Sequence, residues 1–238
     1  MRHALFRLLG IALAIAAPAA GAPAAERVAT AVVFAVDVSG SVDAGRYELQ
    51  RSGIAAIFAG AGIENALGAG VAVAVMEWSD GHVVVVPWTI LRTAAEAHAL
   101  AVRIRSTPRA QGYTTELSLA LLAAADLLDA CPCAAASRVI DVSGDGPNNG
   151  PMSTTIARDQ VVARGIRING LPIVTPEEPD LARWYRDNVV GGAGAFVEVA
   201  DGYEDFARAM RRKFLVEVAA PGIGPRRGLS LARSGATP

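Results

Sequence analysis

Lysine is nearly absent from the sequence. Lys213 is the only lysine among 238 residues, and arginines and acidic residues balance to a net charge of −1. Proteins that bind nucleic-acid backbones present a stripe of Lys and Arg, so the sequence predicts no nucleic-acid partner. The one basic run is Arg211, Arg212 and Lys213. We expect it at the solvated end of a helix, where positive charge complements the helix dipole.

Cysteine is scarce as well. Cys131 and Cys133 are the only two, too few for a zinc site, which takes about four nitrogen or sulfur ligands. In an oxidising compartment the pair can form a disulfide, although a bridge between residues two apart closes a tight ring. We expect a structural disulfide, and a redox-active pair is the alternative.

An apolar stretch near the start is too short to span a bilayer, which takes about 20 residues. It runs from Leu8 through Ala17, follows Arg2 and Arg7, and precedes small residues from Ala19 to Ala25. This order is that of a secretory signal peptide. We therefore predict a signal peptide at 1–25 and a periplasmic or secreted mature protein without stable membrane insertion. A buried N-terminal helix or a membrane anchor is the alternative.

Apolar stretches typical of buried strands alternate with helical patterns along the rest of the chain. Strands are expected at 30–37, 71–78, 82–88, 138–142, 166–174 and 195–199, and helices at 44–59, 93–105, 115–129, 156–164, 180–188 and 203–216. Such alternation predicts an α/β fold with a doubly wound, mostly parallel six-stranded sheet and helices on both faces. Asp80-Gly81 favours a type I′ hairpin turn with positive φ, which makes the third strand an antiparallel edge strand.

One domain is expected, at 26–219, because no linker or repeat interrupts this series. From Ala220 onward the pattern stops, and Pro and Gly punctuate the chain. We expect residues 220–238 to form a flexible tail.

Polar side chains follow the ends of two expected strands and precede one helix. Asp37, Ser39 and Ser41 follow the first strand, Asp145 follows the fourth, and Thr114 precedes the helix between the third and fourth strands. Ligands of open α/β sheets bind beyond the carboxyl ends of the strands, so these residues are expected to meet at one edge. Each segment alone could instead be ordinary: the serines could cap a helix, and the second aspartate could belong to a turn.

Together these residues offer only oxygen ligands, which suit a hard divalent cation. Mg²⁺ is the expected ion, with Ca²⁺ and Mn²⁺ as alternatives. Because the hydroxyls are neutral, Asp37 and Asp145 would only balance the charge of the ion. Because such an ion takes about six ligands, one coordination position would stay open to a ligand from outside the protein. The ion would attract a carboxylate to that position.

The residues also resemble a known family. Asp-x-Ser-x-Ser after the first strand, a Thr in a Gly-x-Thr turn and Asp-Gly after the fourth strand are similar to the von Willebrand factor A domain and its metal-ion-dependent adhesion site (MIDAS). The resemblance covers residues 28–217 and is closest to exported bacterial members known only as a domain of unknown function. It implies that Ser39, Ser41 and Thr114 bind the ion directly, and that Asp37 and Asp145 bind it directly or through water.

Two positions depart from the family pattern or leave it ambiguous. Many members have Thr before the second aspartate, whereas this chain has Gly144. Thr115 follows Thr114 and is the alternative ligand; otherwise it is expected to be the N-cap of the next helix. Some relatives move their last helix when the site fills, and the sequence leaves open whether the helix at 203–216 does so.

The predicted function is an adhesion or assembly module, without catalysis, whose metal ligates an Asp or Glu of a protein partner. A metal-dependent hydrolase or phosphatase is one alternative. Against it, aspartyl-phosphate chemistry needs a second Asp where Ser39 stands, and no Ser-His-Asp set is evident. A metal-free structural assembly domain is the other alternative.

Overall fold

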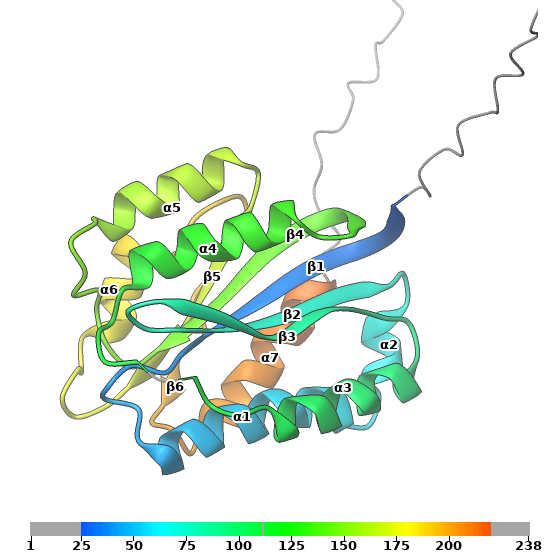
Figure 1. Ribbon diagram of the computed structural model, residues 1–238, viewed down its shortest axis with the longest axis horizontal. Helices are drawn as coiled ribbons and strands as arrows, with labels where there is room; N and C mark the ends of the chain where they lie inside the picture. The colour runs from blue at the N-terminus through cyan, green and yellow to red at the C-terminus, as the bar shows by residue number, and fades with distance from the viewer. Residues whose placement is uncertain (1–24, 111, 220–238) are drawn as a thin grey trace, which may run out of the picture.

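The computed structural model describes residues 25–110 and 112–219. The expected tail at 220–238, and all but the last residue of the expected signal peptide, lie outside the described residues. The strands are β1 (Glu26–Asp37), β2 (Val71–Trp78), β3 (His82–Leu91), β4 (Cys133–Gly144), β5 (Arg167–Val174) and β6 (Ala200–Asp201). The helices are α1 (Ala44–Ala59), α2 (Ile63–Leu67), α3 (Ala94–Ser106), α4 (Leu117–Asp129), α5 (Thr154–Ala163), α6 (Leu181–Asn188) and α7 (Phe206–Ala219) (Figure 1). Within these ranges no helix has both the length and the apolar character that a membrane crossing requires.

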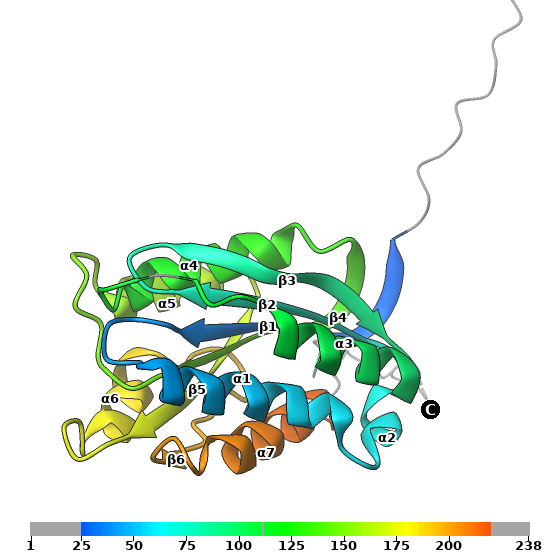
Figure 2. The ribbon, with the colours of Figure 1, turned by 60° about the horizontal axis from the view of Figure 1, so that its bottom comes forward.

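The six strands form one sheet in the order β3-β2-β1-β4-β5-β6. β3 runs antiparallel to β2, and the other neighbours are parallel. Helices α1, α2, α3 and α7 cover one face, and α4, α5 and α6 cover the other (Figure 1, Figure 2). The expected doubly wound fold with one antiparallel edge strand is confirmed. Because β1 and β4 are parallel neighbours, their carboxyl ends meet at the same edge of the sheet.

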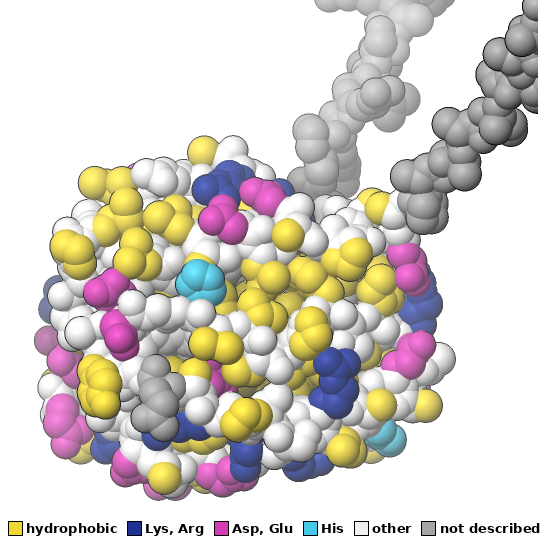
Figure 3. Space-filling model, viewed as in Figure 1, with side chains coloured by type: hydrophobic (Ala, Val, Ile, Leu, Met, Phe, Trp, Pro, Cys, Tyr) yellow, Lys and Arg dark blue, Asp and Glu magenta, His cyan; other side chains and the backbone are white. Residues whose placement is uncertain are grey.

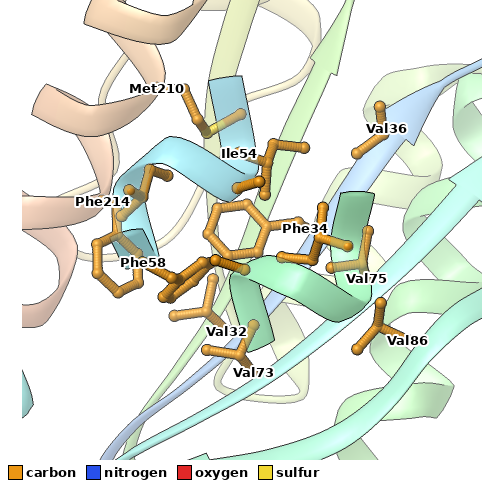
Figure 4. Packing of buried hydrophobic residues seen from close by; sticks show 14 of the residues in the cluster. Val32, Phe34, Val36, Ile54, Phe58, Val73, Val75, Val86, Met210 and Phe214 are labelled. Atoms are coloured by element: carbon orange, nitrogen blue, oxygen red, sulfur yellow. The ribbon is translucent and has the colours of Figure 1, made fainter. Parts of the chain in front are cut away.

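The central strands are buried because helices cover both faces of the sheet. Every residue of β2 is buried, as is β1 from Thr30 to Asp37. On the α1 face, Phe34 packs against Phe58 of α1 and Phe214 of α7, with ring centroids 6.1 and 5.9 Å away (Figure 4). This aromatic cluster joins α7 to β1 and α1, which are distant from it in sequence, and fixes two helices against the sheet.

The β3 edge of the sheet is open to solvent. Val83 and Val84 are 51% and 39% exposed, and Figure 3 shows hydrophobic side chains gathered over this strand. Val86 and Leu91 of the same strand are buried against the core. One solvated side and one buried side are typical of an antiparallel edge strand.

β2 and β3 form the expected hairpin, in which Trp78 pairs with His82. The expected type I′ turn is wrong, because neither Asp80 nor Gly81 has a positive φ. A neighbouring loop shapes the connection instead: the Asp80 carboxylate accepts a hydrogen bond from Tyr113 N at 2.9 Å. A tertiary contact therefore overrides the local preference of the Asp-Gly pair.

The sixth strand is not where the sequence predicted it. Residues 195–199 form only an isolated bridge, between Val197 and Gly170, and β6 is a two-residue strand beside β5. A side chain takes the place of a strand partner here, since Phe196 N donates a hydrogen bond to Asn169 Oδ1 at 3.1 Å. An apolar pattern alone does not reveal such a substitution.

The expectation that Lys213 lies at a solvated helix end is wrong. Lys213 is wholly buried on the core-facing side of α7, together with Met210, Phe214 and Glu217. Arg212 is exposed, but it too lies in the middle of α7 and not at a helix end. Three consecutive residues span about 200° of a helix, so a run of three charges on an amphipathic helix readily turns one of them inward.

Cys131 and Cys133 form a disulfide, as expected. The bridge lies between α4, which ends at Asp129, and β4, which begins at Cys133. It therefore fixes the turn through which the chain enters the central strand β4.

Candidate metal centre

Asp37 is the last residue of β1, and its side chain is wholly buried. Its Oδ1 accepts a hydrogen bond from Ser39 N at 2.7 Å, and its main-chain oxygen accepts one from Gln50 Nε2 at 3.1 Å. These bonds fix the turn that leads from β1 toward α1. Asp37 Oδ2 is buried and has no hydrogen-bond partner among the described residues.

The residues predicted from the first and fourth strands lie together. Because β1 and β4 are paired through Val36, Asp145 lies just beyond β4 and beside the turn that follows β1. Ser41 Oγ donates to Asp145 Oδ1 at 2.7 Å, and Ser39 Oγ lies 3.3 Å from Ser41 Oγ. With Asp37 bound to Ser39 N, four of the predicted residues form one hydrogen-bonded chain.

Thr114 lies in a loop that contacts the same turn. Gly40 N donates to Tyr113 O at 3.2 Å, and Ser79 Oγ donates to the main-chain oxygen of Thr114 at 2.5 Å. A Cβ at Gly40 would lie 3.1 Å from Tyr113 O, so the glycine permits this close approach. The Thr114 side chain is exposed, and it stays the predicted third hydroxyl ligand.

Thr115 does not cap α4, contrary to expectation. The cap position belongs to Glu116, which makes no side-chain cap hydrogen bond. The main chain of Thr115 binds Asn149 instead: Thr115 N donates to Asn149 Oδ1 at 2.8 Å, and Thr115 O accepts from Asn149 N at 3.0 Å. These bonds tie the loop that carries Thr114 to the segment after β4, which carries Asp145.

The Asp37 carboxyl lies in surroundings that disfavour its charged form. Burial raises the pKa of Asp37 to about 7, the hydrogen bond from Ser39 opposes this rise, and the negative charge of Asp145 adds to it. A cation beside the free Asp37 oxygen would stabilise the ionised carboxylate. The oxygen ligands and the unpaired buried carboxylate therefore fit a hard divalent cation.

The departure at Gly144 has a steric reason. A Cβ at this position would lie 2.8 Å from Asp37 Oδ2, 2.9 Å from Tyr185 Oη and 3.3 Å from Trp78 Cζ2. Tyr185 and Trp78 are wholly buried and have little room to move. They occupy the space that a threonine side chain would need. Tyr185 is thus part of the centre's wall, which the amphipathic pattern of α6 did not indicate.

Gly144→Ala is expected to lower the free energy of unfolding by about 1–3 kcal/mol, the usual cost of an added methyl group in a filled core. It is also expected to weaken Mg²⁺ binding, because the Asp37 carboxylate or the Tyr185 ring must shift. Gly146→Ala is the matched control, since a Cβ there meets nothing within 4 Å. Denaturant unfolding and calorimetric titration measure both effects. Equal stability of the two variants would contradict the steric explanation.

Arg46 also belongs to this centre, although no sequence pattern predicted it. Its Nη1 donates to Ser41 O at 2.9 Å and lies 3.6 Å from Asp145 Oδ2. Its guanidinium also lies over the Tyr203 ring, 5.2 Å from the centroid. The available signal was its place in the first turn of α1, directly after the Ser41 turn. Arg46 places a fixed positive charge beside the carboxylates.

A hollow of about 620 Å³ adjoins Arg46 and Tyr203. Four acidic residues contribute to its lining: Asp43, Glu177, Asp201 and Glu204. The centre is therefore flanked by open space with a polar wall.

A family described as "Protein of unknown function (DUF1194)" matches residues 27–222. The chain belongs to this family. A search of curated protein sequences found no match to this DUF1194 member. Its fold does match solved structures. A von Willebrand factor type A structure from Catenulispora acidiphila is 17% identical, with a TM-score of 0.53, over 82% of this chain and 43% of that one. The expected von Willebrand factor A-like fold is thus confirmed.

Two further structures share the fold of this DUF1194 chain. The pilus adhesin SpaC from Lactobacillus rhamnosus GG has a TM-score of 0.62 at 15% identity, over 82% of this chain and 31% of that one. Proximal thread matrix protein 1 from the mussel byssus, in a structure with a zinc-occupied MIDAS motif, has a TM-score of 0.57 at 15% identity, over 82% and 46%. The chain spans less than half the length of each protein. At these identities the likeness shows the fold alone.

Proposed function

We propose that the chain is an exported protein-binding module, of the adhesion or assembly type, that grips an Asp or Glu of its partner through a divalent cation. The ion would be held by Asp37, Ser39, Ser41, Thr114 and Asp145, with Mg²⁺ as the first choice and Ca²⁺ or Mn²⁺ as alternatives. The observation that carries the proposal is the buried, unpaired Oδ2 of Asp37. A bound cation would be the positively charged partner that this buried carboxylate oxygen lacks among the described residues.

Charge explains why the partner group would be acidic. Asp37 and Asp145 neutralise a divalent ion, and Arg46 adds a positive charge beside them. The filled centre therefore has an excess of positive charge and attracts a carboxylate that completes the ligands of the ion. Tyr113, which is 80% exposed next to Thr114, is placed to contact a bound partner. The adjoining hollow leaves room for residues that flank the ligating carboxylate.

Two relatives of the fold support this proposal. The mussel protein holds zinc in its MIDAS motif, and SpaC is a pilus adhesin. Export rests on the signal-peptide pattern of residues 1–25. The mature chain would meet its partner outside the cytoplasm, where the Cys131–Cys133 disulfide is stable.

Ser41→Ala is expected to weaken Mg²⁺ binding at least about tenfold, because it removes a hydroxyl that binds Asp145 and is a proposed ligand. Calorimetric titration of Mg²⁺, Mn²⁺ and Ca²⁺ into the wild-type protein and the variant measures the loss. Ser106→Ala, at the exposed end of α3, is the matched control and should bind as the wild type does.

The same variants test partner binding. Immobilised wild-type protein is expected to capture a protein from cell-envelope extract in Mg²⁺ but not in EDTA. Ser41→Ala is expected to lose the same protein, whereas Ser106→Ala keeps it. Capture that persists both in EDTA and with Ser41→Ala would contradict ligation through the metal.

A further inference from the structure

Four polar side chains lie buried together between α7 and the sheet. Lys213 Nζ of α7 contacts Asp141 Oδ1 of β4 and donates a hydrogen bond to Glu217 Oε1 at 3.0 Å. Asn169 Nδ2 of β5 donates to the same Glu217 oxygen at 2.8 Å. All four side chains are inaccessible to solvent. The only amine side chain of the protein is thus held against two carboxyl groups in its interior.

The surroundings of this group are apolar. Asp141 lies beside Phe34 in the register of β4 with β1. Met210 and Phe214, on the same side of α7 as Lys213, are wholly buried. These side chains exclude water, so the amine and the carboxyl meet at low dielectric and without competition from solvent.

The ionic form of the group is incompletely satisfied. Two carboxylates face one ammonium, and Asp141 Oδ2 and Glu217 Oε2 are buried without a hydrogen-bond partner within the described ranges. Burial, and next the negative charge of Glu217, raise the pKa of Asp141 well above its ordinary value, while Lys213 opposes the rise. Asp141 therefore favours its protonated form, and Glu217 is the base that faces the Lys213 amine.

We propose that Lys213 and Asp141 condense to an amide, an isopeptide bond that joins α7 covalently to β4. A proton first passes from the Lys213 ammonium to the Asp141 carboxylate, which gives a neutral amine and a carboxylic acid. Nζ then attacks Asp141 Cγ, the N–C bond forms, and the C–O bond to the carboxyl hydroxyl breaks. Glu217 accepts the proton from Nζ and delivers it to the hydroxyl, which leaves as water. No oxidant or co-reactant is needed, and Glu217 is regenerated. Asn169 acts as a positioning residue that holds Glu217 against the amine.

Proximity and charge both favour this condensation. Groups held in reactive contact behave as if present at about 10⁵–10⁸ M, and the released water is lost to solvent. The amide also removes one buried cation and one buried anion, which are costly to keep in the interior. The bond closes a loop from residue 141 to residue 213 and restricts the unfolded chain as a disulfide does, but it is insensitive to reductant.

The test is the mass of the intact full chain after reduction of the Cys131–Cys133 bridge. The wild-type protein is expected to be lighter by one water molecule than the mass calculated for its sequence between its measured ends. Trypsin is expected to release peptide 139–158 joined to peptide 213–226. A wild-type mass equal to the calculated one, with the two peptides separate, would overturn the proposal. This measurement does not depend on the folding of any variant.

Three variants identify the reacting groups. Lys213→Arg removes the amine and Glu217→Gln removes the proton acceptor, so each is expected to show its full calculated mass. Asp141→Asn is expected to lose ammonia in place of water and to reach the same final mass as the wild type. A water deficit that persists in Lys213→Arg places the dehydration elsewhere, as at an Asp-Gly succinimide, and overturns the link. A link that persists in Glu217→Gln overturns the role of Glu217.

Discussion

Asp37→Asn is expected to lower Mg²⁺ affinity at least about 100-fold and, without metal, to stabilise the protein at neutral pH. Asparagine keeps the shape of the side chain and the oxygen that accepts from Ser39 N, but it removes the charge that burial disfavours. A carboxylate that served only structure would lose stability on this change. The opposite signs of the two effects therefore distinguish a metal site from a structural turn.

The pH dependence follows from the raised pKa of Asp37. Its value in the folded protein, about 7, lies above the ordinary 3.8, so the folded state binds this proton more tightly than the unfolded chain does. The contribution to stability is full below about pH 4 and is lost as the pH rises through about 7. Without metal, this group is expected to cost roughly 4 kcal/mol of unfolding free energy over that interval. Saturating Mg²⁺ should remove the decline, because the ion takes the place of the proton.

Denaturant unfolding between pH 4 and pH 8, in EDTA and in Mg²⁺, measures these effects. The difference between the wild type and Asp37→Asn isolates this carboxyl from the other titrating groups. Asp187→Asn, on the exposed side of α6, is the matched control and should follow the wild type. A wild-type curve that parallels Asp37→Asn at every pH in EDTA would show that the buried carboxylate carries no such cost.

Phe34→Ala is expected to lower the free energy of unfolding by about 3–5 kcal/mol. Phe34 is wholly buried and contacts Phe58 and Phe214, so its loss leaves a cavity at the junction of β1, α1 and α7. Domains of this kind are stable by about 5–15 kcal/mol, so the loss is a large part of the total. Val102→Ala, on the exposed side of α3, is the control. A loss below about 1 kcal/mol would show that the aromatic cluster closes around the vacant space.

The helices and strands with a regular pattern of apolar residues were predictable from the sequence. The expected limits of α1 and β2 agree with the structure, and β4 and β5 lie where buried apolar runs indicated. The sixth strand was misplaced because the Asn169 side chain replaces a strand partner. The turn at Asp80 was misjudged because its carboxylate binds Tyr113 N. In both cases a contact from a distant segment decided the conformation, and no local pattern contains such a contact.

The candidate site, too, was predictable from the sequence only in part. Asp37, Ser39, Ser41 and Asp145 were found from their places at strand ends, since parallel neighbours bring those ends to one edge. Tyr185 was missed because it belongs to the site only by filling the space that a side chain at position 144 would need. Arg46 was also missed, because an arginine early in a helix is ordinary until the structure shows which carboxylate it faces.

The interior charges were the least predictable feature. A basic run near the end of the chain suggested a solvated helix end, and the acidic residues Asp141 and Glu217 offered no warning. The pairing of Asp141 with Lys213 depends on α7 lying across β4, which is a property of the packed fold, whereas Glu217 lies one turn beyond Lys213 on the same helix. The sequence shows where charges lie along the chain, whereas burial depends on the direction in which each side chain points.

The position of β1 has a mechanical consequence. Its carboxyl end carries the proposed partner-binding site, and its amino end, at Glu26, lies at the opposite end of the sheet (Figure 1). A pull between an attachment at Glu26 and a partner at Ser39 would run along the axis of this strand. β1 lies between β2 and β4 and is parallel to both, so such tension shears two ladders of hydrogen bonds at once. Rupture then requires many bonds to fail together, which suits a contact that must hold under load.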